Sequence, residues 1–247
     1  MARGLGLPAL TGPFLLAAVA YLAAGIALFA LLRPDPYLLA RRLARLEPAA
    51  TGSSGSSAAS ARVAPGAYVG AAIMVLTQIS MVAVMTMTPV HMRAHDHDLA
   101  HIGLVIGVHV GAMFLPSLVT GALVDRVGRV PMAVAAAVTL LLAGVTGALA
   151  PGGSLALLML ALALLGLGWN FGLIAGTALV VDGTVPADRP RTQGAIDVLV
   201  AVAGAGGGAL SGVVVAATTF GTLSVAGGLL SLLLVPVLGW SRRPRVR

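Results

Sequence analysis

The chain has 247 residues, of which 58% are hydrophobic and only 9% are charged, and its mean hydropathy is +1.01. The surface of a soluble domain needs more charge than this, so the composition excludes a soluble fold and favours a polytopic membrane protein. The net charge of +7 comes from arginine without any lysine, and the absence of cysteine excludes disulfides, thiol catalysis and cysteine-ligated metals.

Seven long apolar stretches fill most of the chain. Each is close to the roughly 20 residues that an α-helix needs to cross about 30 Å of hydrocarbon. Backbone amides must pair within a segment in lipid, and the runs lack the short alternating pattern of a barrel, so the expected fold class is an all-α membrane bundle. The predicted transmembrane spans are 14–32, 67–90, 102–124, 131–150, 155–181, 194–217 and 219–240.

The first span is expected to remain as an uncleaved helix, because it runs into Arg33 and not into a small-residue cleavage site. In the segment that follows, residues 37–46 place leucines on one stripe, which predicts a short helix in the membrane interface. Residues 52–60 are only Gly, Ser and Ala, which predicts a flexible connection. The predicted organisation is a single helix in 1–33, a cytoplasmic linker in 34–66, a six-helix bundle in 67–240 and a basic tail in 241–247.

The arginines predict how the spans are oriented. Thirteen of the fifteen lie in connections on one side of the predicted membrane, and only Arg3 and Arg93 lie on the other. The positive-inside bias therefore puts the N-terminus outside and the C-terminus in the cytoplasm, as an odd number of spans requires. Anionic membrane lipid explains the basic charge, and no nucleic acid partner is expected. A composition rich in Arg, Ala, Gly and Leu is consistent with a GC-rich bacterial genome, hence with the inner (plasma) membrane.

The connection after the second span, residues 91–101, contains four of the five histidines and two aspartates. Histidine-rich tracts can bind zinc or nickel. A solvated loop explains this exposed segment more simply, so the sequence predicts no metal site.

The connection after the third span reads Gly121-Ala-Leu-Val-Asp-Arg-Val-Gly-Arg129. A carboxylate at a helix end, beside two guanidiniums in a tight turn, can bind neighbouring helix ends through charge-assisted hydrogen bonds. We call this segment the latch loop, since such contacts would hold one conformation of a rocking bundle. The simpler interpretation is a positively charged turn with glycine for backbone freedom. The residues expected to form the latch are Gly121, Asp125, Arg126, Gly128 and Arg129.

The latch loop resembles the G-x-L-x-D-R-x-G-R loop of the major facilitator superfamily, with Val130 where that family usually has another basic residue. Segments 109–121, 168–171 and 191–197 also resemble bacterial members. The resemblance covers essentially the whole chain, but only as the second half of a transporter, in which two six-helix halves rock about a central substrate site. It implies that five helices of the first half are missing. The chain is then a fragment, or pairs with a missing N-terminal half or second subunit, or is residual.

The two sets of three spans, 67–150 and 155–240, must enter the membrane from opposite sides. Inverted triplets are typical of transporters, although an odd number of crossings in each set gives the same topology by itself.

Asp197 lies near one end of the sixth span. At about 100° per residue it shares a helix face with Gly204, Gly208 and Gly212, a small-residue ridge that lets another helix approach, so Asp197 is expected to face protein. A carboxylate there is interpreted either as a proton-coupling or gating group, or as a helix cap or an ion-pair partner of Arg126 or Arg129.

Four further polar residues within the spans are candidates for lining a cavity. A lone histidine in a bundle, here His109, is either a proton relay or a hydrogen-bonded packing residue. Trp169 and Asn170 lie in the middle of a span, too deep for an interfacial aromatic belt, and either line a substrate cavity or pack. Gln78 adds polarity to the second span.

Other classes of protein fit less well. Seven spans and Asp125-Arg126 after the third also describe G-protein-coupled receptors, but the chain lacks cysteine and an Asn-Pro-x-x-Tyr segment. Lysine is absent, so a retinal Schiff base is excluded. No phosphate loop or nucleophile beside a base supports an enzyme, and no cofactor is expected. The resemblance implies secondary transport of a small solute by alternating access. The alternative is a degenerate half-transporter or a noncatalytic membrane scaffold.

Overall fold

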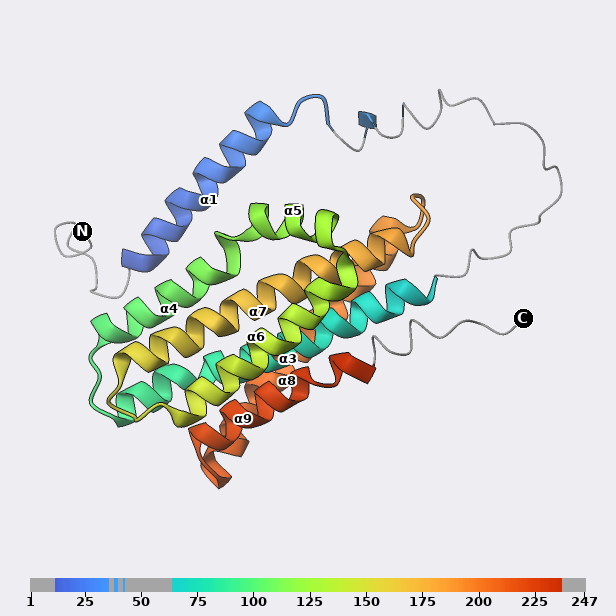
Figure 1. Ribbon diagram of the computed structural model, residues 1–247. Helices are drawn as coiled ribbons and strands as arrows, with labels where there is room; N and C mark the ends of the chain where they lie inside the picture. Colours follow the sequence, from blue (N-terminus) through green and yellow to red (C-terminus); the bar gives the residue numbers. More distant parts are fainter. Residues whose placement is uncertain (1–11, 36–37, 40–41, 43–63, 237–247) are drawn as a thin grey trace. The chain divides into compact units, whose positions relative to one another are not determined.

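The computed structural model describes residues 12–35, 38, 39, 42 and 64–236 (Figure 1). The chain divides into two compact units, Met1–Ala59 and Ser60–Arg247, which are described separately. Every regular element within the described residues is a helix, which confirms the all-α fold class. The division after Ala59 falls inside the predicted linker, whose domain boundaries stay a prediction.

The first unit contains helix α1, Gly12–Leu31. Its side chains from Phe14 onward are exposed and apolar on every face, which is the pattern of a helix that can be surrounded by lipid. The guanidinium of Arg33 lies 4.3 Å from the centre of the Phe29 ring. The predicted interfacial helix falls mostly outside the described residues, as do the Gly/Ser/Ala connection and the basic tail.

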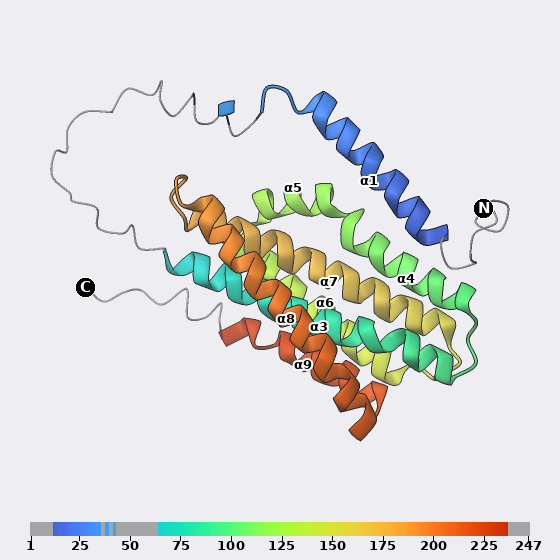
Figure 2. The ribbon, with the colours of Figure 1, turned by 180° about the vertical axis from the view of Figure 1, so that it is seen from behind.

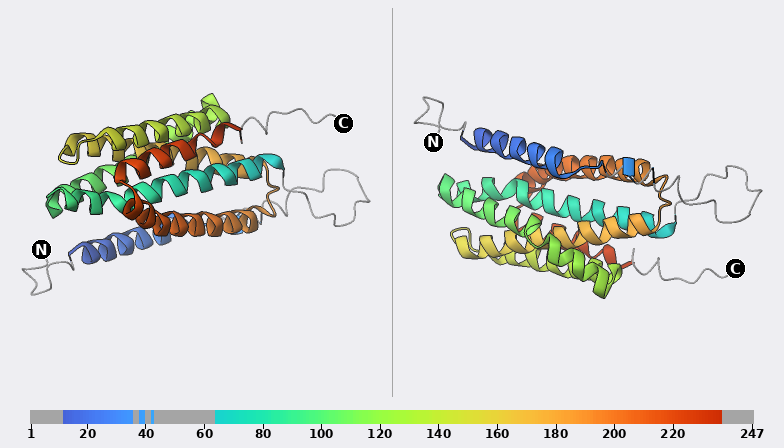
Figure 3. Two further views of the ribbon diagram at one scale, coloured as in Figure 1. Left: turned by 90° about the horizontal axis from the view of Figure 1, so that it is seen from below. Right: turned by 90° about the horizontal axis from the view of Figure 1, so that it is seen from above.

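The second unit is a bundle built around two long antiparallel helices, α3 and α7 (Figures 1 and 2). Helix α7 contacts α3, α4, α5 and α6, whereas α8 and α9 pack mainly against α3 and α6. Helix α8 lies on the far side of α3 from α5 and α6 (Figure 3). The helices are α3 (Pro65–Ala94), α4 (Leu99–Phe114), α5 (Ser117–Val127), α6 (Arg129–Leu149), α7 (Leu155–Asp182), α8 (Arg189–Ala217) and α9 (Phe220–Ser231).

Six stretches of the described chain are long and apolar enough to cross a membrane, and they coincide with the first six predicted spans. The seventh predicted span, 219–240, corresponds to the shorter apolar stretch Phe220–Pro236, which begins with α9. Its last four residues lie outside the described part of the chain.

The third predicted span is interrupted, which the hydropathy pattern did not predict. Helix α4 ends at Phe114 and α5 begins at Ser117, with Pro116 between them. Proline has no backbone N–H and its ring clashes with the carbonyl four residues earlier, so it breaks or kinks a continuous helix.

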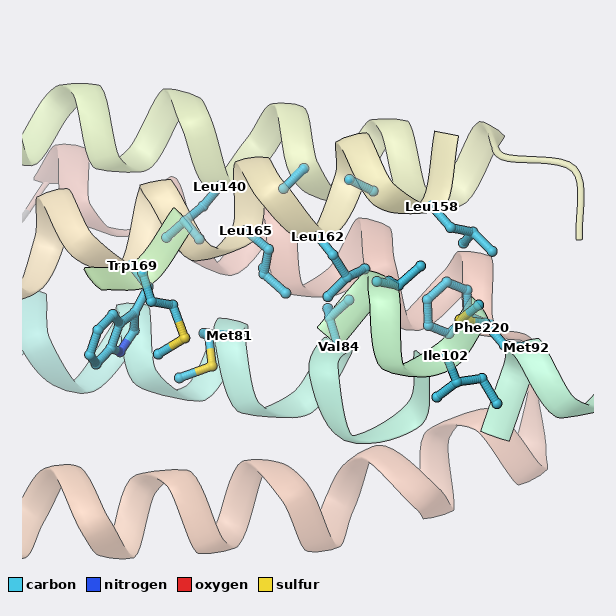
Figure 4. Close-up of a cluster of buried hydrophobic side chains, with 14 residues drawn as sticks. Met81, Val84, Met92, Ile102, Leu140, Leu158, Leu162, Leu165, Trp169 and Phe220 are labelled. Carbon is cyan, nitrogen blue, oxygen red and sulfur yellow. The ribbon is translucent and has the colours of Figure 1, made fainter. Parts of the chain in front are cut away.

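The core runs between α3 and α7, where large apolar side chains interlock (Figure 4). Figure 4 shows Trp169 beside Met81 at one end of this cluster, and Leu158, Ile102 and Phe220 toward the other. Small residues bring the two backbones together beyond the cluster: a Cβ on Gly70 would lie 2.4 Å from the Gly176 carbonyl oxygen. Close packing through glycine is the usual way for membrane helices to associate.

Candidate functional site

The latch loop, residues 121–129, comprises the end of α5, Gly128 and the first residue of α6, so that Gly128 alone connects the two helices. Its φ is +104°, a conformation that glycine adopts readily and that side chains with a Cβ disfavour. Its N–H donates to the Val124 carbonyl at 3.0 Å, which closes the last turn of α5. The sharp turn sets Asp125, near the end of α5, close to Arg129, the first residue of α6.

Arg129 makes two ionic contacts. Its Nε donates to Oδ2 of Asp182 at 2.9 Å, and its Nη1 lies 3.9 Å from Oδ1 of Asp125. Arg129 therefore joins α5, the start of α6 and the end of α7. The side chain of Arg129 is 33% exposed, that of Asp182 is 53% exposed and that of Asp125 is 77% exposed, so these three charges lie at the surface of the unit. Arg126 is exposed and forms no ion pair with any residue that the structure describes.

A groove of about 410 Å³ runs between α5 and α7 beside these charges. Charged and small polar groups line one part of it and apolar side chains line the rest. The lining includes Gly121, Asp125, Arg129, Thr177, Val181 and Asp182.

Asp182 is the member of this site that the sequence interpretation missed. It is the last residue of α7, where the helix dipole is unfavourable to a carboxylate that has no cationic partner. An acidic residue directly after the fifth apolar span, at the same end of the bundle as the latch loop, was a signal that could have identified it.

The structure corrects the interpretation of Asp197. This residue is exposed, and its carboxylate accepts a hydrogen bond from Gln193 Nε2 at 2.8 Å, one turn earlier in α8. The expected ion pair with Arg126 or Arg129 is absent, because α8 packs against α3, away from the latch loop. The expectation that Asp197 faces protein was also wrong within this unit.

The small-residue ridge on α8 lies along α3. A Cβ on Gly204 would lie 2.9 Å from Gln78 Nε2, and one on Gly208 would lie 3.4 Å from Val82 Cγ1. At Gly212 the spacing has opened, with Met87 Cε at 4.0 Å. Asp197 lies at the opposite end of this ridge, beyond its close contact with α3.

Gln78 and Trp169 are paired in the middle of the bundle. Trp169 Nε1 donates to Gln78 Oε1 at 2.7 Å, which joins α7 to α3. The Phe114 ring, 58% exposed, meets the Trp169 indole edge-on, with the ring centres 5.9 Å apart. Trp169 itself is 9% exposed and packs in the buried cluster, Gln78 is half-buried, and none of the three side chains is charged.

Asn170 does not share this surface, since its side chain is buried. Its Nδ2 donates to the Met113 carbonyl at 2.8 Å and to Ser117 Oγ at 3.0 Å. Its Oδ1 accepts from Thr120 Oγ1 at 2.6 Å. The amide is therefore bonded on both sides of the interruption between α4 and α5.

His109 is also buried, with 1% of its surface exposed. Its Nδ1 lies 2.8 Å from the Leu162 carbonyl oxygen. Because a carbonyl only accepts hydrogen bonds, Nδ1 must carry the hydrogen and donate it. Nε2 is buried and has no hydrogen-bond partner among the described residues. The packing interpretation of His109 describes this arrangement better than a cavity-lining role does.

The histidines near the α3–α4 connection pack more than a solvated loop would. The His91 ring stacks on Phe220 at 4.3 Å and lies equally far from His95, and His97 Nε2 lies 3.0 Å from the Gly152 carbonyl oxygen. Asp98 caps α4 by accepting the His101 backbone N–H at 2.8 Å, and this bond lowers the pKa of the Asp98 carboxyl. Among the described residues, no three histidine, aspartate or glutamate side chains are placed together so that they could hold a metal ion.

Comparison with known proteins identifies the family. The family model described as Major Facilitator Superfamily matches two overlapping stretches of the chain, residues 4–207 and 69–247. The uncharacterized MFS-type transporter YdeG of Bacillus subtilis (strain 168) is 60% identical over 245 residues, which cover 98% of this chain and 56% of YdeG. The uncharacterized MFS-type transporter YddS of the same organism is 52% identical over 241 residues, covering 97% and 55%.

A third relative is more distant. The riboflavin transporter RfnT of Brucella anthropi is 36% identical over 165 residues, which cover 66% of this chain and 41% of RfnT. The chain spans about half the length of the curated relatives YdeG and YddS. All three relatives are named as transporters and none as an enzyme, in agreement with the sequence-based expectation. With its six long apolar helices, this multi-pass membrane chain belongs to the major facilitator superfamily.

Proposed function

We propose that this chain forms part of a secondary transporter that moves a small solute across the membrane by alternating access. The observation that carries the proposal is the ionic contact of Arg129 with Asp182 and Asp125, which joins three helices at one end of the bundle. Contacts of this kind hold one arrangement of the helix ends and release it at low cost, because exposed ion pairs contribute little free energy. That is what a gate that opens in each cycle requires.

The solute is proposed to contact the group formed by Gln78, Trp169 and Phe114. An indole and a phenyl ring offer stacking surfaces, and the Gln78 carboxamide offers N–H donors and an oxygen that already accepts from Trp169 and can accept a second hydrogen bond. With no charge in this group, the solute class that fits is a planar, largely uncharged ring compound. The relative named as a riboflavin transporter supports riboflavin as the first solute to assay.

The complete machine is proposed to include helices beyond those of this chain, because a central cavity between two halves needs both walls. The chain is proposed to lie in the bacterial plasma membrane with the latch loop on the cytoplasmic side, since the arginine-rich connections are at that end. The coupling ion is proposed to be the proton. Asp197, which is exposed in the described unit, stays a proposed coupling residue that would face the other wall.

Proteoliposomes test this function directly. The chain would be reconstituted alone and together with the part of YdeG that it does not match, and riboflavin uptake would be followed with and without a proton gradient. Gradient-dependent uptake by the combined assembly is the expected result. Trp169→Phe should reduce it about ten-fold or less, as loss of a stacking surface and one hydrogen bond predicts. Trp240→Phe, which changes the other tryptophan, is the matched control.

If the combined assembly moves neither riboflavin nor a panel of other ring compounds under any ion gradient, the transport proposal fails. A noncatalytic scaffold would then be the better hypothesis. If uptake occurs but Trp169→Phe and Trp240→Phe behave alike, the transport proposal stands and the proposed solute site is wrong.

A further inference from the structure

The interruption of the third span leaves backbone groups that a membrane helix must satisfy internally. In an unbroken helix, the Met113 carbonyl would accept from the N–H of residue 117. No such backbone bond forms across the gap, and the Asn170 side chain donates to the Met113 carbonyl in its place. An unpaired carbonyl in hydrocarbon is costly, so Asn170 stabilises the broken form of this helix.

Asn170 also bonds to the helix that follows the break. Ser117 is the first residue of α5 and Thr120 is one turn later, and both hydroxyls contact the Asn170 amide. Asn170 and Thr120 are each 1% exposed, so water does not compete for these bonds. One buried amide from α7 therefore holds the last turn of α4 and the first turn of α5 at once.

Helix α4 has a second, independent attachment to α7, and α5 does not share it. A Cβ on Gly166 would lie 2.5 Å from the His109 carbonyl oxygen, so the α4 and α7 backbones are in close contact there. His109 Nδ1 also bonds to the Leu162 carbonyl. In α5, by contrast, Leu118 and Val119 are 90% and 68% exposed.

Helix α5 is held at its first turn by the Asn170 amide. Toward its other end it is held by Val124, which is buried in a cluster with side chains of α3, α6 and α7, and by the contact of Asp125 with Arg129. Eleven residues of helix span about 16 Å, so a tilt of roughly 20° about the first end would move the last end by about 6 Å. A rigid element fixed at one end, and held at the other by an exposed ionic contact and one buried side chain, has the mechanics of a lever.

We propose that Asn170 is the pivot of α5. When the contacts of Arg129 with Asp125 and Asp182 open, α5 swings about Pro116, and the Asn170 amide keeps its hydrogen bonds to the broken helix end. Asn170 is then a positioning residue that connects the middle of the bundle to the latch loop. Its consequence for transport rests on the proposed function, whereas the swing itself is measurable without any transport.

The test measures two distances in the chain by spin-label spectroscopy. The chain has no cysteine, so Leu123→Cys with Val181→Cys labels α5 against the end of α7, and Leu104→Cys with Leu160→Cys labels α4 against α7. All four side chains are partly exposed, at 37–49%. Each pair is introduced into the unaltered chain and into two variants, Asn170→Leu and Thr120→Val.

Thr88→Val is the matched control. Thr88 is buried like Thr120, but its hydroxyl donates to the Val84 carbonyl of its own helix. Thr120→Val is the milder variant if Asn170→Leu fails to fold, because it removes one of the three hydrogen bonds and leaves the Met113 carbonyl paired.

The expected result is that positions of α5 in which its first turn has left Asn170 rise about five-fold in population in Thr120→Val, the effect of losing one buried hydrogen bond that those positions lack. They should rise further in Asn170→Leu, while the α4–α7 distance stays unchanged and Thr88→Val alters neither pair. An unchanged α5–α7 distance in both variants, or equal broadening of both pairs, overturns the pivot.

Transport then separates the two proposals. In the combined assembly, the pivot predicts that Thr120→Val changes the maximal uptake rate and leaves the apparent KM for the solute unchanged. If the distances change as expected and no solute is moved by any form, the proposed function fails and the pivot stands.

Discussion

Arg129 and Asp182 begin one helix and end the next, and the 2.9 Å contact between Nε and Oδ2 brings together residues 53 positions apart. The pair ties the latch loop to α7, the helix that also carries Trp169 and Asn170. A change at this end of the bundle is therefore connected through one continuous helix to the middle of the membrane.

Neutralising Asp182 should loosen the latch without unfolding the bundle. With side chains 33% and 53% exposed, the pair contributes about 1 kcal/mol or less to the free energy of unfolding. Asp182→Asn should therefore lower the melting temperature only slightly. The distribution of distances between spin labels at positions 123 and 181 should broaden, because α5 becomes more mobile. Arg126→Gln, which removes a charge of the same size and opposite sign from a side chain with no ion pair among the described residues, is the control.

Exchanging the two charges tests whether attraction is the cause. The double variant Arg129→Asp with Asp182→Arg should bring the α5 distance back toward that of the unaltered chain, and each single variant should not. If the double variant is as mobile as Asp182→Asn, then packing and not charge holds the loop.

Hydropathy predicted the first six spans well, because the free energy of moving side chains into lipid depends on local sequence, whereas the seventh corresponds to a shorter apolar stretch. In the structure Gly204 and Gly208 of the expected ridge lie against α3, whereas Gly212 has more space, and a period of 3.6 explains why these glycines share a face. That period does not say which helix approaches. The ion-pair alternative for Asp197 therefore named the wrong neighbours, and Asp182 was overlooked as the partner of Arg129.

The break at Pro116 was not predicted for a related reason. A proline within an apolar run either kinks a membrane helix or interrupts it, and the outcome depends on side chains that satisfy the freed groups. Here the side chain is that of Asn170, which lies 57 residues after Met113 in the sequence. The sequence marks Asn170 as unusual within an apolar span but cannot identify its partners.

The two glycines of the latch loop should differ sharply in tolerance. Gly128 has a φ of +104°, so Gly128→Ala should strain the turn by about 1–3 kcal/mol and separate Asp125 from Arg129. A Cβ on Gly121 would meet nothing within 4 Å, so Gly121→Ala should leave the fold intact. Thermal melting of the two variants in one detergent measures the difference. Equal melting temperatures would show that the turn accommodates a Cβ.

Close packing of α6 on α9 gives a second glycine prediction. A Cβ on Gly144 would lie 2.4 Å from the Ser224 carbonyl oxygen and 2.9 Å from Gly228 Cα, both of them backbone atoms. Gly144→Ala should therefore push the helices apart and destabilise the bundle by about 1–3 kcal/mol.

Gly206→Ala in α8 is the matched control, because its Cβ would meet no atom within 4 Å. It should be neutral or stabilising by up to about 1 kcal/mol, as alanine favours helix over glycine. Unfolding of both variants by denaturing detergent measures the contrast. A Gly144→Ala variant as stable as the unaltered chain would mean that α9 can shift without loss of packing.

The N-terminal cap of α4 should respond to acid. The His101 backbone N–H lowers the pKa of the Asp98 carboxyl, with a smaller favourable contribution from the His101 ring at 2.9 Å. A group whose pKa is lowered by folding stabilises the fold above its unfolded pKa, about 3.9 for Asp, and the stabilisation is lost as pH falls through the lower folded pKa. The first turn of α4 should thus stay capped at neutral pH and fray only below about pH 4.

Hydrogen exchange at the first turn of α4, compared with the intrinsic rate at each pH, measures this fraying. Asp98→Ala should remove the protection at every pH, whereas Asp98→Asn should keep the cap and abolish its loss in acid, because asparagine caps without titrating. Asp96→Asn removes the same charge from a neighbouring exposed position and should change neither. If protection in Asp98→Asn still falls with pH as in the unaltered chain, a group other than Asp98 causes the fraying.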